Sequence, residues 1–227
     1  MRERIKSFLK RRAKFLCRLP FVNRLRLRGT RLEQGKAIFA KCRFDCRGTG
    51  NSIRFEDGSA CVRCTFFIRG NHNAIVIGKN AHVREGEFWI EDDGNRVTVG
   101  ENTLLCGKTH LACTEGRSIT IGRDCLFSSD LVFRTGDSHS LTDLSGRRIN
   151  PARDITVGDH VWIGHRALIC KGVVLPRDCV VGTGAVVTRG AFDEHTVIAG
   201  SPARTVRQNV SWDIRRLPAN GAEGANE

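Results

Sequence analysis

The segment Asp137-Ser138-His139 holds a candidate for moving a proton, the imidazole of His139. Imidazole titrates near neutral pH, so it can take a proton from one group and pass it to another. A base of this kind needs a group that orients it, and Asp137 stands two residues away. A histidine in an ordinary exposed loop has the same local signature, so the spacing alone leaves both interpretations open.

Metal binding is a second chemistry that the residue types suggest. Two cysteine pairs superficially resemble a zinc ribbon: Cys42-x3-Cys46 and Cys61-x2-Cys64. Cys46 and Cys61 fall in apolar columns once the repeat described below is aligned, and free cysteine packs as a small hydrophobic side chain. We therefore expect core packing and no metal site. Because no signal-peptide pattern is present, the ten cysteines are expected to be cytosolic thiols.

An internal repeat of 22 residues indicates the elements that must position these side chains. Shifting the chain by 22 aligns an apolar column at Phe55, Ile77, Val99 and Ile121. Parallel columns begin at Ile53 and Cys61, and an aromatic column comprises Phe44, Phe66 and Phe88. His110 stands where that aromatic column would continue. This position predicts a core histidine with satisfied hydrogen bonds, or alternatively a side chain that binds a substrate.

Beyond residue 150 the period tightens to six residues. Five hexads follow in frame over residues 157–186, each with an aliphatic first residue and a small fifth residue: VGDHVW, IGHRAL, ICKGVV, LPRDCV and VGTGAV. Three hexads make 18 residues, and the 22-residue unit adds an excursion of four. The frame predicts triangular coils of short strands that stack at about 4.8 Å, with Gly, Asn or Asp at the turns. An ordinary β-sandwich would not require a fixed frame of six.

The charge separates the chain into a basic arm and a nearly neutral body. Residues 1–31 carry twelve Lys or Arg and one acid, whereas the other 196 residues carry 25 bases and 23 acids. Apolar residues recur at helical spacing until Pro20, which predicts a basic amphipathic helical arm over 1–31. The arm either contacts an anionic membrane surface through residues 1–20 or docks on its own domain. We expect the coiled domain over 32–207 and a largely disordered tail over 208–227.

The hexads resemble those of the left-handed parallel β-helix acyltransferases. The motifs that carry the likeness are VWIG at 161–164, AVVTRG at 185–190 and AGSPAR at 199–204. The chain is similar in particular to sugar O-acetyltransferases of the galactoside/maltose and capsule/O-antigen types, over roughly residues 50–207. The resemblance implies an all-β, left-handed β-helix, an acetyl-CoA donor, a sugar hydroxyl as acceptor, and a homotrimer with active sites between subunits.

The stretch RTGDSHSLTDLSGRRIN at 134–150 matches the loop that carries the catalytic histidine in that family. By this resemblance His139 is the general base, oriented by Asp137 or Glu115. Glu115 lies 22 residues before Asp137, so it should stack one coil away. Both acids could equally be solvated turn residues. Candidates for binding the sugar are His110, Arg134 and Trp162, the last of which could instead pack between subunits.

The resemblance assigns acetyl-CoA to the last coils. Motif alignment places the contacts at His165, Thr183, Thr188, Arg189, Arg204 and Arg207. Small residues would let the pantetheine arm lie against the coil, and arginines can pair with CoA phosphates. Arg189 replaces a common lysine and keeps its charge, whereas His165 replaces a small polar residue. The alternative for the arginines is a solvated rim.

Two other functions use the same coils. A γ-carbonic-anhydrase-like zinc hydratase could use His160-x4-His165, although these histidines occupy other hexad places than in that family. A non-catalytic scaffold at a membrane surface would fit the basic arm. We predict an O-acetyltransferase for capsule, O-antigen or exopolysaccharide precursors, located in the cytoplasm or peripherally at the inner face of the membrane. No specific nucleic-acid contact is expected.

Overall fold

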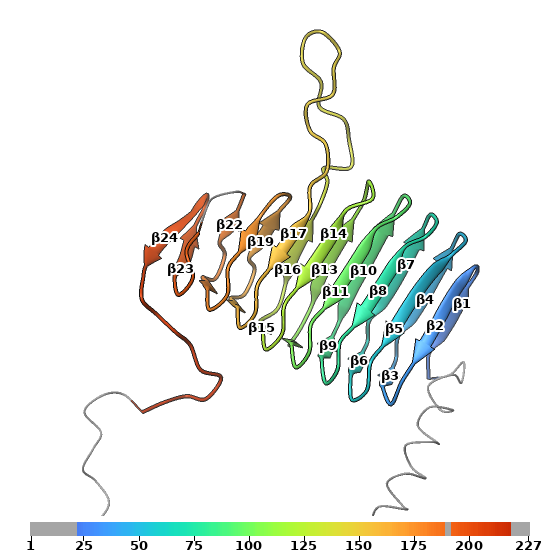
Figure 1. Ribbon diagram of the computed structural model, residues 1–227, viewed down its shortest axis with the longest axis horizontal. Helices are drawn as coiled ribbons and strands as arrows, with labels where there is room; N and C mark the ends of the chain where they lie inside the picture. Colours follow the sequence, from blue (N-terminus) through green and yellow to red (C-terminus); the bar gives the residue numbers. More distant parts are fainter. Residues whose placement is uncertain (1–21, 189–191, 219–227) are drawn as a thin grey trace, which may run out of the picture.

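Stacked triangular coils of short strands make up the described part of the chain, residues 22–188 and 192–218 of a computed structural model (Figure 1). Each coil contributes one strand to each of three sheets, in which all strands are parallel except the last strand of the third sheet, and strands three apart in sequence are neighbours along most of the prism. This arrangement follows from the repeat, because an apolar residue at every inward position can be buried only when successive coils stack. The fold is the predicted all-β, left-handed parallel β-helix.

The three sheets are the three sides of the prism. The first sheet contains β1 (Arg24–Leu27), β4 (Arg43–Arg47), β7 (Thr65–Arg69), β10 (Gly86–Glu91), β13 (Thr109–Cys113), β16 (Leu131–Arg134), β19 (Leu168–Cys170) and β22 (Val186–Val187). The second contains β2 (Thr30–Gln34), β5 (Asn51–Phe55), β8 (Ala74–Ile77), β11 (Arg96–Val99), β14 (Ser118–Ile121), β17 (Ile155–Val157) and β20 (Val174–Leu175). The third contains β3 (Ile38–Ala40), β6 (Ala60–Val62), β9 (His82–Arg84), β12 (Leu104–Leu105), β15 (Leu126–Phe127), β18 (Trp162–Ile163), β21 (Val180–Val181), β23 (Val197–Gly200) and β24 (Ala203–Arg207).

The strand register confirms the predicted apolar ladders. One ladder runs unbroken through the second sheet: Phe55, Ile77, Val99, Ile121, Val157 and Leu175. The aromatic ladder is also present, since the Phe66 ring stacks on Phe44 at 4.5 Å and on Phe88 at 4.8 Å between centroids. The spacing between successive residues of the first ladder changes from 22 to 36 between Ile121 and Val157, and then to 18 between Val157 and Leu175. The ladder stays continuous through both changes. The extra residues of the 36-residue step form the loop that projects from the prism between β16 and β17 (Figure 1).

Polar residues at the corners adopt the left-handed backbone conformation that the turns require. Asn80, Asn102 and Asp124 have φ of 54°, 57° and 57°, values that Asn and Asp tolerate better than most residues. The Asn102 Nδ2 atom donates to Asp124 Oδ1 at 2.9 Å, so side chains one coil apart are hydrogen-bonded along the edge of the prism. Each turn therefore supports the next coil.

The predicted boundary between the basic arm and the coiled domain is too late in the chain. β1 pairs in parallel with β4, and β2 with β5, so residues 24–31 already belong to the first coil. Their alternating inward side chains pack against the core, including Leu25 and Leu27. Residues 1–21, where the helix was predicted, lie outside the described residues. Within the described ranges no helix has the length and apolar character of a membrane span.

The register of β13 differs from the prediction by one residue. Phe88 pairs with Leu111, a step of 23 positions, so Leu111 enters the core and His110 faces outward. The extra residue lies between β12 and β13. The chain is one residue shorter between β13 and β14, so β14 returns to the 22-residue step and Ile119 pairs with Val97. A shift of one residue moves every side chain of a strand to its other face. The prediction of His110 as a core residue is therefore wrong.

The cysteine pairs pack in the core, as expected. Cys42, Cys46, Cys61 and Cys64 are all buried members of the apolar cluster. Removal from water raises the pKa of the Cys46 thiol to about 12, which keeps it protonated at neutral pH. In the described residues no group of three or more His, Cys, Asp or Glu side chains is arranged to hold a metal ion.

Candidate active site

A groove of about 1020 Å³ runs along the outer face of the first sheet and reaches the base of the projecting loop. Strands β4, β7, β10, β13 and β16 supply its wall, and residues 136–148 of the loop supply its end. Four of the predicted site residues line it: His139, Glu115, Arg134 and His110. The topology explains the gathering, because outward side chains at the same strand position stand one coil apart in a row.

His139 is exposed at the loop end of the groove. Its backbone N–H donates to the Asp137 carbonyl at 2.8 Å, which makes a tight turn around Ser138. Within the described residues the imidazole forms no ion pair with a carboxylate, so neither predicted orienting acid holds it in this chain. The ring is consequently free to meet another molecule.

The carboxylate of Asp137 is held by other groups. It accepts hydrogen bonds from the Lys171 ammonium and, at 2.9 Å, from Asn150 Nδ2. The hydrogen bond from Lys171 is the largest cause that lowers the pKa of Asp137, so the group remains ionised. Asp137 therefore anchors the start of the loop to β19 and does not line the groove.

Glu115 holds the other side of the loop. Its carboxylate accepts from the Arg148 guanidinium at 2.5 Å and from the Ala152 backbone N–H at 3.1 Å. The bond from Arg148 is the main cause that lowers the pKa of Glu115. Glu115 and Asp137 therefore brace the loop through Arg148 and Lys171 respectively.

Asn150 is a positioning residue that sequence reasoning missed. Its buried amide donates to the His139 carbonyl at 2.8 Å as well as to Asp137, and its Oδ1 accepts from the Leu141 N–H at 2.7 Å. It thus ties both sides of the loop base together and fixes the backbone that carries His139. The only signal in the sequence was an Asn at the end of the matched loop, and no spacing rule connects it with His139.

Two further predicted residues face the groove. Arg134 donates to Ser138 Oγ at 2.7 Å, beside His139. His110 Nδ1 lies 3.0 Å from Glu87 Oε2, and its ring is partly exposed. Both side chains present hydrogen-bonding groups to a ligand in the groove.

The predicted donor residues lie elsewhere on this chain. His165 and Thr183 stand on the corner between the third and first sheets, and the His165 ring bonds to Ser129 Oγ at 3.0 Å. Thr188, Arg204 and Arg207 are exposed, and neither arginine has an acidic partner among the described residues. Guanidinium groups without an acidic partner and small exposed threonines fit an anionic, extended ligand such as CoA. Arg189 falls outside the described residues.

Trp162 is not part of the groove. It lies on the third sheet, is 41% exposed, and its ring centroid is 6.2 Å from that of Trp212 in the C-terminal segment. Trp212 also stacks on His160 at 4.3 Å and donates to the His160 carbonyl at 2.8 Å. Residues 208–218 have no regular secondary structure, but part of this predicted disordered tail is thus packed on the prism.

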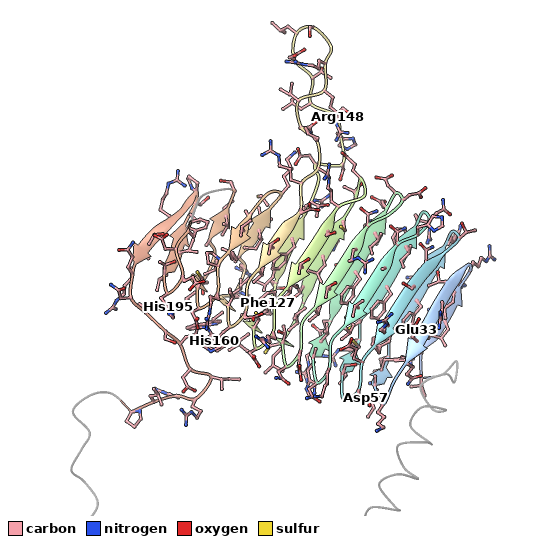
Figure 2. All side chains as sticks on the ribbon, in the orientation of Figure 1. Glu33, Asp57, Phe127, Arg148, His160 and His195 are labelled. Carbon is pink, nitrogen blue, oxygen red and sulfur yellow. The ribbon has the colours of Figure 1, made fainter. Side chains whose placement is uncertain are left out.

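The geometry does not support a zinc hydratase. His160 Nδ1 is bonded to Asp178 Oδ1 at 2.7 Å, whereas the ring of His165 faces Ser129 on a different corner of the prism. Figure 2 shows His160 and His195 well away from the loop that carries Arg148. The two histidines of the H-x4-H spacing therefore do not converge on one ion.

The comparisons with known proteins indicate which proteins the chain is similar to. A family model described as the hexapeptide repeat of succinyl-transferase matches residues 154–189. Together with the coiled fold, this match and the relatives below show that the chain is similar to the hexapeptide-repeat acetyltransferases.

Two curated relatives and one solved structure show which acetyltransferases the chain is similar to. A polysialic acid O-acetyltransferase of Escherichia coli O1:K1 is 32% identical over 90 residues, which cover 39% of this chain and 29% of that protein. A putative lipopolysaccharide biosynthesis O-acetyl transferase, WbbJ of Escherichia coli K12, is 33% identical over 38% of this chain and 48% of its own length. The crystal structure of the polySia-specific acetyltransferase NeuO superposes with a TM-score of 0.78 at 28% identity, covering 88% of this chain and 90% of that one. The aligned region spans less than half of each of these two curated relatives.

Proposed function

We propose that the protein transfers an acetyl group from acetyl-CoA to a hydroxyl of a bacterial surface glycan or its precursor. The observation that carries the proposal is His139, an imidazole without an ion-pair partner among the described residues, at the end of a polar groove, on a loop braced to the coil on either side of its own. Relatives of this chain are named as O-acetyltransferases of polysialic acid and of lipopolysaccharide biosynthesis, which supports a saccharide as the acceptor.

In the proposed reaction His139 accepts the proton of the sugar hydroxyl while the oxygen attacks the thioester carbonyl. The carbon–sulfur bond then breaks, and the imidazolium returns the proton to the departing CoA thiolate, so the histidine ends the cycle unchanged. Glu115, Asp137 and Asn150 act as positioning residues because they fix the loop without touching the ring. Arg134 and His110 would hold the acceptor beside the base.

The separation of the two half-sites favours an oligomer. The groove lies on the first sheet, whereas the proposed donor residues Thr183, Arg204 and Arg207 stand on the last coils and do not line it. A neighbouring copy could bring its donor residues to the projecting loop, and we propose a homotrimer with sites between subunits. Light scattering should then give three times the chain mass of 25.2 kDa. A monomeric, active protein would contradict this arrangement.

Replacement of the candidate base tests the function. His139→Ala should lower acetyl-CoA-dependent CoA release by at least about a hundredfold, the usual contribution of a general base. His82→Ala is the matched control, because His82 is an exposed histidine on the third sheet. A panel of sugars, with mass spectrometry of the product, would identify the acceptor. Unchanged CoA release in His139→Ala would overturn the assignment.

Cellular location is a separate part of the proposal. We propose the cytoplasm or the inner face of a membrane as the location, because the basic residues of segment 1–20 would favour an anionic lipid surface. Removing residues 1–20 should release the protein from vesicles that contain anionic lipid, measured by co-sedimentation. Equal binding with and without the segment would contradict a membrane role for the arm.

A further inference from the structure

On the outer face of the first sheet, a row of stacked aromatic side chains is interrupted by an alanine. The strand register places Phe67, Trp89, Ala112 and Arg134 in a line, one per coil. Phe67 and Trp89 stack with centroids 3.9 Å apart and planes 14° from parallel, and the Arg69 guanidinium lies 4.0 Å from the Phe67 centroid. At the next coil the row continues with alanine, so the stack ends at Trp89.

The methyl group of Ala112 leaves a slot between Trp89 and Arg134. These two residues stand two coils apart, which corresponds to about 10 Å at the usual strand spacing. That width admits one ring between the side chains of Trp89 and Arg134. Ala112 and both flanking residues line the groove, and Trp89 is 37% exposed although it is the largest apolar side chain there.

The edges of the slot carry groups that bind hydroxyls. His110 stands beside it, with its ring centroid 6.4 Å from that of Trp89, and it is paired with Glu87 from the neighbouring coil. Arg134 closes the far side and donates to Ser138, next to His139. An aromatic face flanked by a carboxylate, an imidazole and a guanidinium suits a pyranose ring, which has an apolar C–H face and a polar rim.

We infer that this slot is a saccharide subsite, in which one pyranose ring of the acceptor stacks on Trp89 while a linked sugar presents its hydroxyl to His139. The inference rests on the proposed function for the role of the second sugar. It requires an acceptor of at least two linked sugars. The one-residue shift of β13 helps to form this subsite, because the shift places Ala112 in the row and turns His110 toward the slot.

Filling the slot tests the inference without removing a contact of the core. Ala112→Phe would rebuild the aromatic row and occupy the space of the ring, and Trp89→Ala would remove the stacking face. Val174→Phe is the matched control, because Val174 is 55% exposed on the second sheet, away from the groove. The probe is an array of purified capsule and O-antigen oligosaccharides that includes α2,8-linked sialic acid oligomers, with thermal melting as the check on folding.

The wild type and Val174→Phe should bind the same glycans, and Ala112→Phe and Trp89→Ala should bind them at least tenfold more weakly, about 1.4 kcal/mol. Acetyl-CoA affinity, measured by calorimetry, should be equal in all four proteins. Wild-type affinity of a folded Ala112→Phe would overturn the inference. So would the absence of any glycan bound by the wild type, or displacement of a bound glycan by CMP or UMP, which would assign the slot to a nucleobase. Glycan binding by a wild type that releases no CoA would instead contradict the proposed function alone.

Discussion

Single residues at the base of the loop decide where the candidate base stands. Asp137 and Glu115 are both ionised, and both contact cations rather than His139. Asn150 bonds to the His139 carbonyl and to Asp137, so it links the two ends of the loop at its base. The loop is long and polar, so these few contacts replace the apolar packing that fixes the strands.

Asn150→Ala should impair the reaction while leaving the prism folded. The variant removes donors to Asp137 and to the His139 carbonyl and an acceptor for the Leu141 N–H, and each of these partly buried hydrogen bonds contributes about 0.5–1.5 kcal/mol. We expect faster proteolysis of the loop and a lower kcat with an unchanged KM for acetyl-CoA. Asn209→Ala, in the exposed C-terminal segment, is the control. Equal kcat in wild type and Asn150→Ala would show that the loop is held by other contacts.

Acid should loosen the loop before it unfolds the coils. The pKa values of Glu115 and Asp137 are lowered in the folded protein by Arg148 and Lys171 respectively. Because their pKa values are lower in the folded protein, both carboxylates stabilise the loop fully at any pH above the unfolded pKa values near 4. This stabilisation is lost as the pH falls through the lower pKa values of the folded protein. The protection of residues 137–152 against hydrogen exchange, relative to the intrinsic rate at each pH, should therefore decrease below about pH 4. Protection that is independent of pH in this range would contradict the ion-pair bracing.

At the scale of elements, the one-residue shift of β13 determines what the groove contains. The strands before and after it keep the 22-residue step, so the coil absorbs one extra residue before β13 and loses one after it. The core accepts Leu111 in place of an aromatic ring, and Cys113 in place of Ala112 below Ile90. The same shift brings His110 and Ala112 to the outer face, beside Trp89.

Alanine substitutions at two neighbouring residues test which of the two side chains β13 places in the core. Leu111→Ala should cost about 2–5 kcal/mol because it opens a cavity in the core. His110→Ala should cost less than about 1 kcal/mol because it removes only a partly exposed pair with Glu87. Urea denaturation midpoints give both values. The opposite order would mean that His110, as the 22-residue spacing predicted, occupies the core.

At the scale of the whole molecule, a single apolar core runs along the prism axis and encloses most of the thiols. Seven cysteines are buried, Cys170 is partly accessible and Cys106 is exposed, all nine among the described residues. Burial raises the pKa of the Cys113 and Cys125 thiols to about 11, which suppresses their reactive thiolate forms.

The native protein should therefore react with thiol reagents at Cys106 long before Cys46 or Cys113. Iodoacetamide labelling followed by peptide mass spectrometry should show at least a tenfold difference in rate, which disappears in denaturant. Cys106→Ser should remove the fast site without lowering the melting temperature. Fast labelling of Cys46 in the native state would mean that the N-terminal coils open readily.

The sequence by itself determined the coils, the ladders and the position of the loop. Each coil buries the same inward positions, so the fold repeats locally and the period of the apolar residues is sufficient to predict it. The choice of His139 as the candidate base came instead from the resemblance of residues 134–150 to the loop that carries the catalytic histidine in the acyltransferases.

Only the tertiary structure decided which side chains meet on the surface. His110 was placed on the wrong face because one additional residue before β13 is invisible in a pattern that resumes one strand later. Asn150, Lys171 and Arg148 gather around the loop through contacts between residues 13 to 34 positions apart, for which no periodic signal exists. Inward-facing residues recur with a fixed period because every coil must bury them, whereas outward-facing residues follow no such period. The candidate site lies on an outward face.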